Sequence, residues 1–96
     1  TLGNIGIGGA APSWRSIQKA MHVSPVGSLS SFSAGASSGV DVASNIYIDA
    51  TTNDFHYIVD GPGSLHRQQV GAYHWFSFPA GVTGALATPA KTMSLD

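Results

Sequence analysis

The sequence predicts an all-β fold built from short strands and β-hairpins. Two runs of strand-forming residues, 46–49 and 55–59, flank the turn-forming cluster 51–54. A second pair of runs, 65–69 and 73–78, flanks Gly71. Both ends of the chain alternate between apolar and small or polar residues, at 2–8 and at 92–96. With 96 residues, the chain has room for one domain.

The first quarter of the chain contains two predicted strands and one predicted turn. Residues 2–8 alternate so that Ile5 and Ile7 share one face of a strand, where they would plug a symmetry axis. Trp14 and Ile17 follow Ser13 at helical spacing, which predicts one short helical turn near residues 13–19. Residues 19–24 alternate again before Pro25 and predict a strand.

The segment 26–44 is rich in Gly, Ser and Ala, and by composition it suits a linker. Single apolar residues recur within it too often for a solvated tether, and small residues are what closely packed backbones require. We therefore expect ordered strands or turns here.

The charge content excludes several classes of protein. Five Asp, four Lys or Arg and no Glu give a net charge of −1, so the basic patch of a nucleic-acid-binding protein is missing. No apolar run approaches the roughly 20 residues of a membrane span, so membrane insertion is not expected. A chain this short buries only about 60 to 65% of its unfolded surface by itself, and it has no cysteine for disulfides. Low charge then suggests a surface covered by further copies of the chain.

Catalytic and metal sites are not predicted. His66 and His74 lie on adjacent strands of the second hairpin, where facing residues approach within about 5.5 Å, and a shared ion is conceivable there. No cysteine or Glu completes a ligand set, so we expect no metal and no cofactor. Ser64 near His66 lacks a nucleophile elbow, and Asp49, Asp54 and Asp60 stand at turn positions. The chain is therefore not expected to be an enzyme.

The aromatic residues permit a second interpretation. Tyr47, Tyr57, Tyr73 and Trp75 could form a platform that stacks on sugars. The alternative function is then a monomeric carbohydrate-binding β-sandwich. Against it, Trp75, Phe76 and Phe55 are favoured as core residues, because the chain has little other bulk.

Five motifs in order carry a resemblance to a known family. They are Gly3 to Gly8 with Pro12 and Trp14, Asn45 to Asp49, Phe55 to Ile58, Arg67 to Gln69 with Trp75 and Phe76, and Met93 to Asp96. With these motifs the chain resembles the β-structured segments of bacteriophage tail fibre and tail spike proteins that lie upstream of a self-cleaving chaperone domain. It departs from the pattern at Phe55, where tryptophan is frequent, and at the Pro62-Gly63 loop.

The resemblance implies a structural virion component. Residues 1–96 would be a single segment of a longer fibrous chain, intertwined as a homotrimer and contacting adjacent fibre segments. The fibre would contribute to host-cell attachment through an unidentified glycan or protein of the cell surface. Its location would be the virion, extracellular after assembly in the host cytoplasm.

Two sets of residues are expected to serve this function. The first packs within or between chains and consists of Ile5, Ile7, Trp14, Val23, Ile48, Phe55, Ile58, Trp75, Phe76, Met93 and Leu95. The second is the candidate receptor-facing set, Thr52, Asn53, Asp54, Tyr57, His66 and Tyr73.

Overall fold

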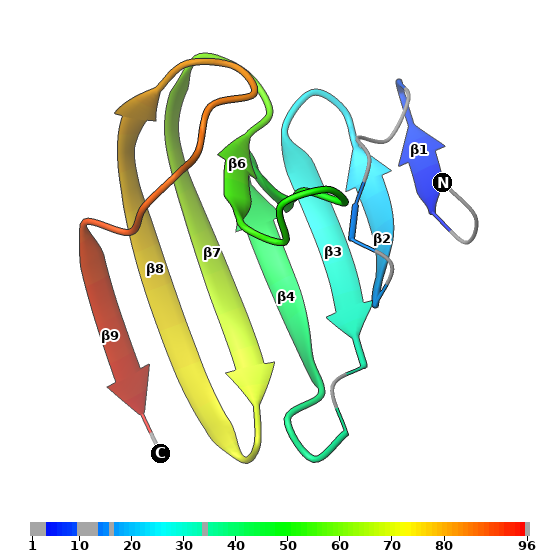
Figure 1. Cartoon of the computed structure of the whole chain (residues 1–96), viewed down its shortest axis with the longest axis vertical. Coiled ribbons are helices and arrows are strands. Elements are labelled where there is room, and N and C mark those ends of the chain that lie inside the picture. Colours follow the sequence, from blue (N-terminus) through cyan, green and yellow to red (C-terminus); the bar gives the residue numbers. More distant parts are fainter. Residues whose placement is uncertain (1–3, 10–13, 16, 34, 96) are drawn as a thin grey trace.

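The computed structural model describes residues 4–9, 14–15, 17–33 and 35–95, and these residues form nine β-strands. In chain order they are β1 (Ile5–Ile7), β2 (Gln18–Val23), β3 (Gly27–Phe32), β4 (Gly39–Ser44), β5 (Ile46–Ile48), β6 (Phe55–Tyr57), β7 (Gly61–Gln69), β8 (Ala72–Gly81) and β9 (Lys91–Leu95). Seven form one sheet in the order β1-β2-β3-β4-β7-β8-β9, and β5 pairs with β6 (Figure 1). The predicted all-β fold is confirmed.

Most predicted elements match observed strands. The first hairpin is β5–β6, and the second is β7–β8, which turns at Val70 and Gly71 with positive φ angles of 54° and 73°. The small-residue segment 26–44 holds β3 and β4, so it is ordered rather than a linker. All sheet neighbours are antiparallel except β1 and β2, which are parallel.

The helical turn expected near residues 13–19 includes Ser13 and Ser16, which lie outside the described residues. The Gln18 backbone N–H donates to the Arg15 carbonyl at 2.9 Å, an i to i+3 bond that closes one tight turn. Gln18 already belongs to strand β2. No helix among the described residues is long and apolar enough to span a membrane.

One face of the large sheet is covered by a layer that we call the cover layer, made of residues 14–15, β5, β6 and residues 84–87. Backbone hydrogen bonds join these segments side by side. Arg15 N–H donates to Ile48 O at 2.9 Å, and Ala87 N–H donates to Phe55 O at 2.8 Å. In Figure 1 β6 and the orange segment after β8 cross in front of the sheet. The large sheet therefore has a covered face and an open face.

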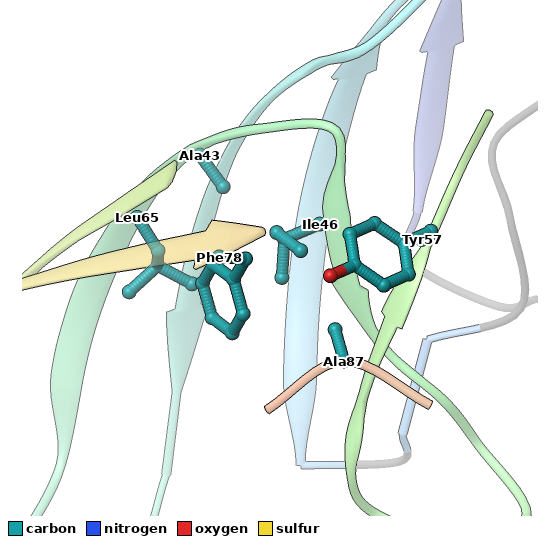
Figure 2. Close-up of a cluster of buried hydrophobic side chains, with 6 residues drawn as sticks. All are labelled: Ala43, Ile46, Tyr57, Leu65, Phe78 and Ala87. Carbon is teal, nitrogen blue, oxygen red and sulfur yellow. The ribbon is translucent and has the colours of Figure 1, made fainter. Parts of the chain in front are cut away.

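The hydrophobic core lies between the sheet and the cover layer. Its main cluster is Ala43, Ile46, Tyr57, Leu65, Phe78 and Ala87 (Figure 2). A second cluster of Trp14, Ala20 and Ile48 lies beside it, and Phe55 packs against both. Burial of these side chains is the main force that holds the cover layer on the sheet.

Tyr57 was expected to face a receptor, and that prediction is wrong. Its side chain is 3% exposed and lies in the main core cluster, with its hydroxyl donating to the Pro79 carbonyl. Residues two apart on a strand share a face, so Tyr57 points inward with Phe55. Gly81 provides the space: a Cβ there would lie 2.1 Å from Cε2 of Tyr57.

Asn45 forms the corner at which the chain leaves the large sheet for the cover layer. Its φ angle is 62°, a conformation that asparagine tolerates better than most residues. Its side-chain nitrogen donates to the carbonyls of Val59, Gly61 and Pro62 at 3.0 to 3.2 Å. Its side-chain oxygen accepts from Val59 N–H at 2.8 Å. One buried side chain thus fixes the departure of β5 and the return of the chain into β7.

The covered face is apolar around Leu65, Phe76 and Phe78 but polar over β2, β3 and β4. There Gln18, His22, Ser28, Ser30 and Asp41 are all buried. His22 is 3% exposed, and this burial lowers the pKa of its imidazole below the ordinary value of 6.5.

We expect stability to fall as the pH drops below 6.5 because of His22. Well above pH 6.5 the imidazole is neutral in both states. Below it, the unfolded chain takes up a proton that the folded chain resists until the lowered pKa is reached, so the unfolded state is favoured. Urea midpoints measured from pH 7.5 to pH 5 should decline in the wild type and decline less in His22→Gln. His74→Gln is the control and should decline as the wild type does. If the urea midpoint of His22→Gln declines as much as that of the wild type, His22 is not the cause. Asp49 and Asp60 have pKa values held below 3.8 by backbone and side-chain hydrogen bonds, so they act outside this pH window.

Candidate functional site on the open face of the sheet

The open face collects large apolar side chains from six of the seven strands, and β7 adds Ser64, His66 and Gln68. Strand alternation sends every second residue to this face, and the cover layer lies on the opposite side. The side chains that it presents are Ile5, Ile7, Lys19, Met21, Val23, Leu29, Ser31, Val40, Val42, Ser44, Ser64, His66, Gln68, Tyr73, Trp75, Ser77, Lys91, Met93 and Leu95.

The strand register aligns seven of these residues in one row across the sheet, which we call the central row. Each neighbouring pair in the row is a direct cross-strand pair. The row is Ile5, Met21, Leu29, Val42, His66, Trp75 and Met93. Six of its seven members are apolar, so an apolar stripe runs from one sheet edge to the other.

Several members of the central row are in contact with solvent in the single chain. Ile5, Leu29, Val42 and Met93 are between 46% and 60% exposed. Monomeric proteins rarely leave a contiguous apolar patch of more than a few hundred Å² uncovered, and such patches mark interaction sites. Covering one half-exposed side chain of this size contributes about 1 kcal/mol.

Three rings form the most bulky part of the open face. Ring centroids of His66 and Trp75 are 5.0 Å apart, Tyr73 lies 6.1 Å from His66 and 6.3 Å from Trp75, and the planes are within 27° of parallel. In a single column, neighbouring rings would be about 3.5 Å apart and the outer two about 7 Å apart. Here all three centroid distances lie between 5.0 and 6.3 Å, so the rings form a triangle that spreads over the sheet.

A shallow groove of about 900 Å³ runs along this end of the central row. Val42, His66, Trp75 and Met93 line it, with Ser64, Ser77 and Lys91 at its side. Among the described residues of the open face, Lys19 and Lys91 are the only charged side chains. If a second surface covered this face, few charged side chains would be removed from water, so the free-energy cost of desolvation would be low.

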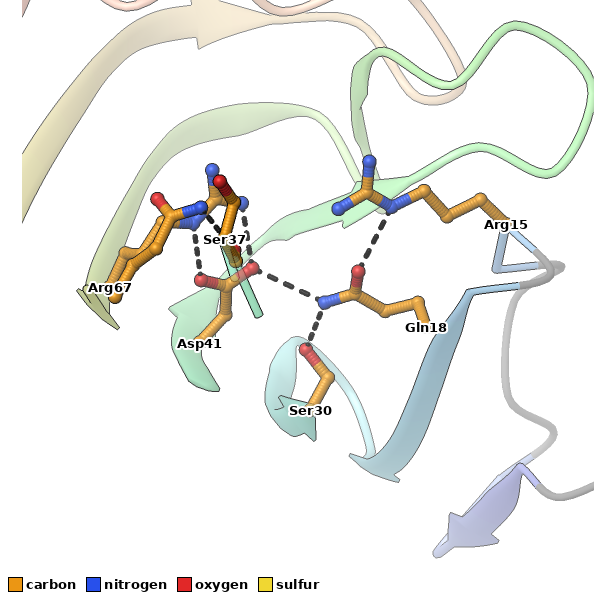
Figure 3. Close-up of polar contacts among 7 residues, drawn as sticks. Arg15, Gln18, Ser30, Ser37, Asp41 and Arg67 are labelled. Atoms are coloured by element: carbon orange, nitrogen blue, oxygen red, sulfur yellow. Dashed lines mark hydrogen bonds and ion pairs between the residues drawn. The ribbon is translucent and has the colours of Figure 1, made fainter. Parts of the chain in front are cut away.

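The covered face carries a polar network that was not predicted from the sequence. Asp41 accepts from Arg67 Nε at 2.7 Å and from Arg67 Nη2 at 2.9 Å, and its Oδ2 accepts from Gln18 Nε2 at 3.2 Å (Figure 3). Gln18 also donates to Ser30 Oγ at 2.6 Å and accepts from Arg15 Nε at 3.0 Å. These bonds link β2, β3, β4 and β7 beneath the cover layer.

Aromatic rings surround the guanidinium groups of this network. The Arg67 guanidinium carbon lies 4.7 Å from the ring centroid of Phe32 and 5.7 Å from that of Phe55. The Arg15 guanidinium carbon lies 5.2 Å from the same Phe32 ring. Burial, and after it the positive charge of Arg67, lowers the pKa of Arg15, while Asp41 opposes that shift. The guanidinium groups of Arg15 and Arg67 therefore lie close together, and the buried carboxylate of Asp41 is paired with Arg67.

The expected packing residues divide between the two faces. Trp14 and Ile48 are buried in the core, Phe55 and Phe76 are partly buried against it, and Ile58 is half-buried. Those on the open face are Ile5, Ile7, Val23, Trp75, Met93 and Leu95. Trp75 is therefore not part of the core between sheet and cover layer. Leu29, Val42 and Met21 were missed, because the strands that carry them were not assigned a register.

The expected receptor-facing residues also separate. Thr52, Asn53 and Asp54 are exposed in the β5–β6 turn, whose backbone is held by Asp49: its carboxylate accepts from Thr51 N–H and Thr52 N–H at 2.9 and 3.0 Å. Thr52 Oγ1 lies 2.9 Å from His56 Nε2. His66 and Tyr73 lie on the other side of the molecule, on the open face.

The idea that His66 and His74 share an ion is wrong. His66 pairs with Trp75 and Arg67 pairs with His74, so the two histidines point to opposite faces of the sheet. The described part of the chain has no group of three or more His, Cys, Asp or Glu side chains placed to hold a metal. Comparison with protein families, curated proteins and solved structures found no match.

Proposed function

We propose that this chain is a structural segment of a homotrimeric phage tail fibre, in which the open faces of three copies pack together. The fibre contributes to attachment of the virion to its host cell. The observation that supports this proposal best is the central row, a mainly apolar stripe that crosses seven strands and has four of its seven side chains exposed in the single chain. The phage origin and the number of three copies come from the resemblance of the sequence motifs.

Further copies of the same chain suit the open face better than another partner does. The described residues of the open face include two lysines and no acid, which offers few charges for recognising a different protein, whereas apolar rows complement one another. The molecule measures 34 × 30 Å along its two longer axes. One face of this size has room for the roughly 800 Å² per partner that a standard interface buries.

The proposal assigns different tasks to the two sides of the molecule. The open face, including His66 and Tyr73, is buried between copies. The cover layer, with Thr52, Asn53 and Asp54 on its turn, faces outward toward the cell. Three identical outward surfaces raise the avidity of individually weak contacts, because later contacts form at high effective concentration.

The molar mass in solution tests this proposal. We expect light scattering over a dilution series to give about three chains per particle, because one chain leaves its apolar face uncovered. The same series separates the proposal from the alternative, a monomeric carbohydrate-binding module. Of its expected platform, Tyr73 and Trp75 lie beside His66 on the open face, whereas Tyr47 and Tyr57 lie in the cover layer. A compact folded monomer at all concentrations would contradict the fibre segment and favour that module.

A further inference from the structure

A pocket of about 410 Å³ lies on the cover-layer side of the sheet, away from the central row. Two arginines, Arg15 and Arg67, line it together with Asn53, Thr88, Phe55 and Leu86. Asp54 also lines it, from the exposed β5–β6 turn. The volume is near the lower end of the range for small-molecule sites, which suits a ligand of about one sugar ring.

The two arginines differ in their partners: Arg67 is paired with a carboxylate, whereas Arg15 is hydrogen-bonded to a neutral amide. Arg67 donates two hydrogen bonds to the carboxylate of Asp41, as a bidentate pair. Arg15 uses its Nε to donate to Gln18, and within the described part of the chain its two terminal guanidinium nitrogens have no hydrogen-bond partner. Both guanidinium groups lie against the ring of Phe32. Arg15 is therefore a cation fixed through its Nε, with two terminal NH2 groups still available to donate hydrogen bonds.

The other residues that line the pocket indicate which further chemical groups the ligand carries. Asn53, Thr88 and Asp54 supply hydrogen-bond acceptors and donors of the kind that hydroxyl groups need. Phe55 and Leu86 offer apolar surface to a carbon framework. Asp54 makes the site unfavourable for a dianion, because its carboxylate repels a second negative charge.

We propose that this pocket binds an acidic monosaccharide unit, with its carboxylate on Arg15 and its hydroxyls toward Asn53, Asp54 and Thr88. The inference relies on the proposed function for its purpose, since it names the class of cell-surface glycan that the outward side contacts. Its test measures ligand binding and not assembly, so the two proposals can fail separately.

Titration of the folded chain with D-glucuronate, followed by NMR, tests the assignment. Backbone resonances of Arg15, Phe55, Leu86 and Thr88 should shift with millimolar ligand, while D-glucose, which has a hydroxymethyl group in place of the carboxylate, should leave them in place. Arg15→Gln should weaken binding about tenfold or more, because a hydrogen bond to a charged group is lost. Arg15→Lys keeps the charge but loses the planar fork, so it should also weaken binding.

Val82→Asp is the matched control, because it lowers the net charge by one, as Arg15→Gln does, at a residue that is 65% exposed and lies outside both the pocket and the open face; it should bind D-glucuronate as the wild type does. Light scattering should give the same mass for Arg15→Gln and the wild type. The proposal is overturned if D-glucuronate moves no pocket resonance at tens of millimolar, or if Arg15→Gln binds it equally well. Binding of inorganic phosphate more tightly than D-glucuronate would likewise overturn the assignment to an acidic sugar.

Discussion

Replacing Asp41 by Ala is expected to lower the free energy of unfolding by about 3 to 5 kcal/mol, the typical cost of removing one partner from a buried ion pair. Asp41 is 1% exposed and accepts hydrogen bonds from both Arg67 and Gln18. Without it, the Arg67 guanidinium remains under the cover layer among aromatic rings with no counter-charge. Urea denaturation at one fixed protein concentration measures the loss, since assembly makes stability depend on concentration.

Two further variants identify the cause. Asp54→Ala removes an exposed carboxylate and should change stability by less than about 0.5 kcal/mol. Asp41→Leu combined with Arg67→Met replaces the whole pair by apolar side chains and should be much more stable than Asp41→Ala alone. If Asp41→Ala unfolds at the wild-type urea concentration, the network contributes little, and the register must be held by the core.

The local elements of this fold could be predicted from the sequence, but the way they face one another could not. The turn at Thr51 to Asp54 and the turn at Gly71 both have residue types that specify a hairpin. The register of the second hairpin depends on the two-residue turn Val70-Gly71, and a change of one position exchanges the two faces. For this reason the sequence pattern permits a site shared by His66 and His74, although their side chains point to opposite faces.

Long-range contacts account for the rest of what was missed. Asp41 and Arg67 are 26 residues apart, and nothing in either local sequence marks them as partners. Alternation also placed apolar residues on both faces of β8, Trp75 on one and Phe76 with Phe78 on the other. Which face the cover layer occupies depends on the corner at Asn45, so the sequence could not show which aromatic residues are core.

Replacing Val42 by Asp is expected to abolish assembly while leaving the fold of the single chain intact. Val42 lies in the middle of the central row, between Leu29 and His66, and is 52% exposed. In a separate chain the new carboxylate reaches water. In the proposed assembly it is buried without a partner, at a cost of several kcal/mol, which weakens association about 100-fold or more. Light scattering should report single chains at concentrations where the wild type is assembled.

Val82→Asp is the matched control, because it makes the same chemical change at a residue that is 65% exposed and lies after β8, outside the open face. Circular dichroism should show the same strand content for both variants. If both variants dissociate, general charge and not the central row controls assembly. If Val42→Asp assembles as the wild type does, the central row is not the contact between copies, and the apolar face must serve another partner. Loss of assembly in Val42→Asp alone would place the contact on the row that the strand register lines up.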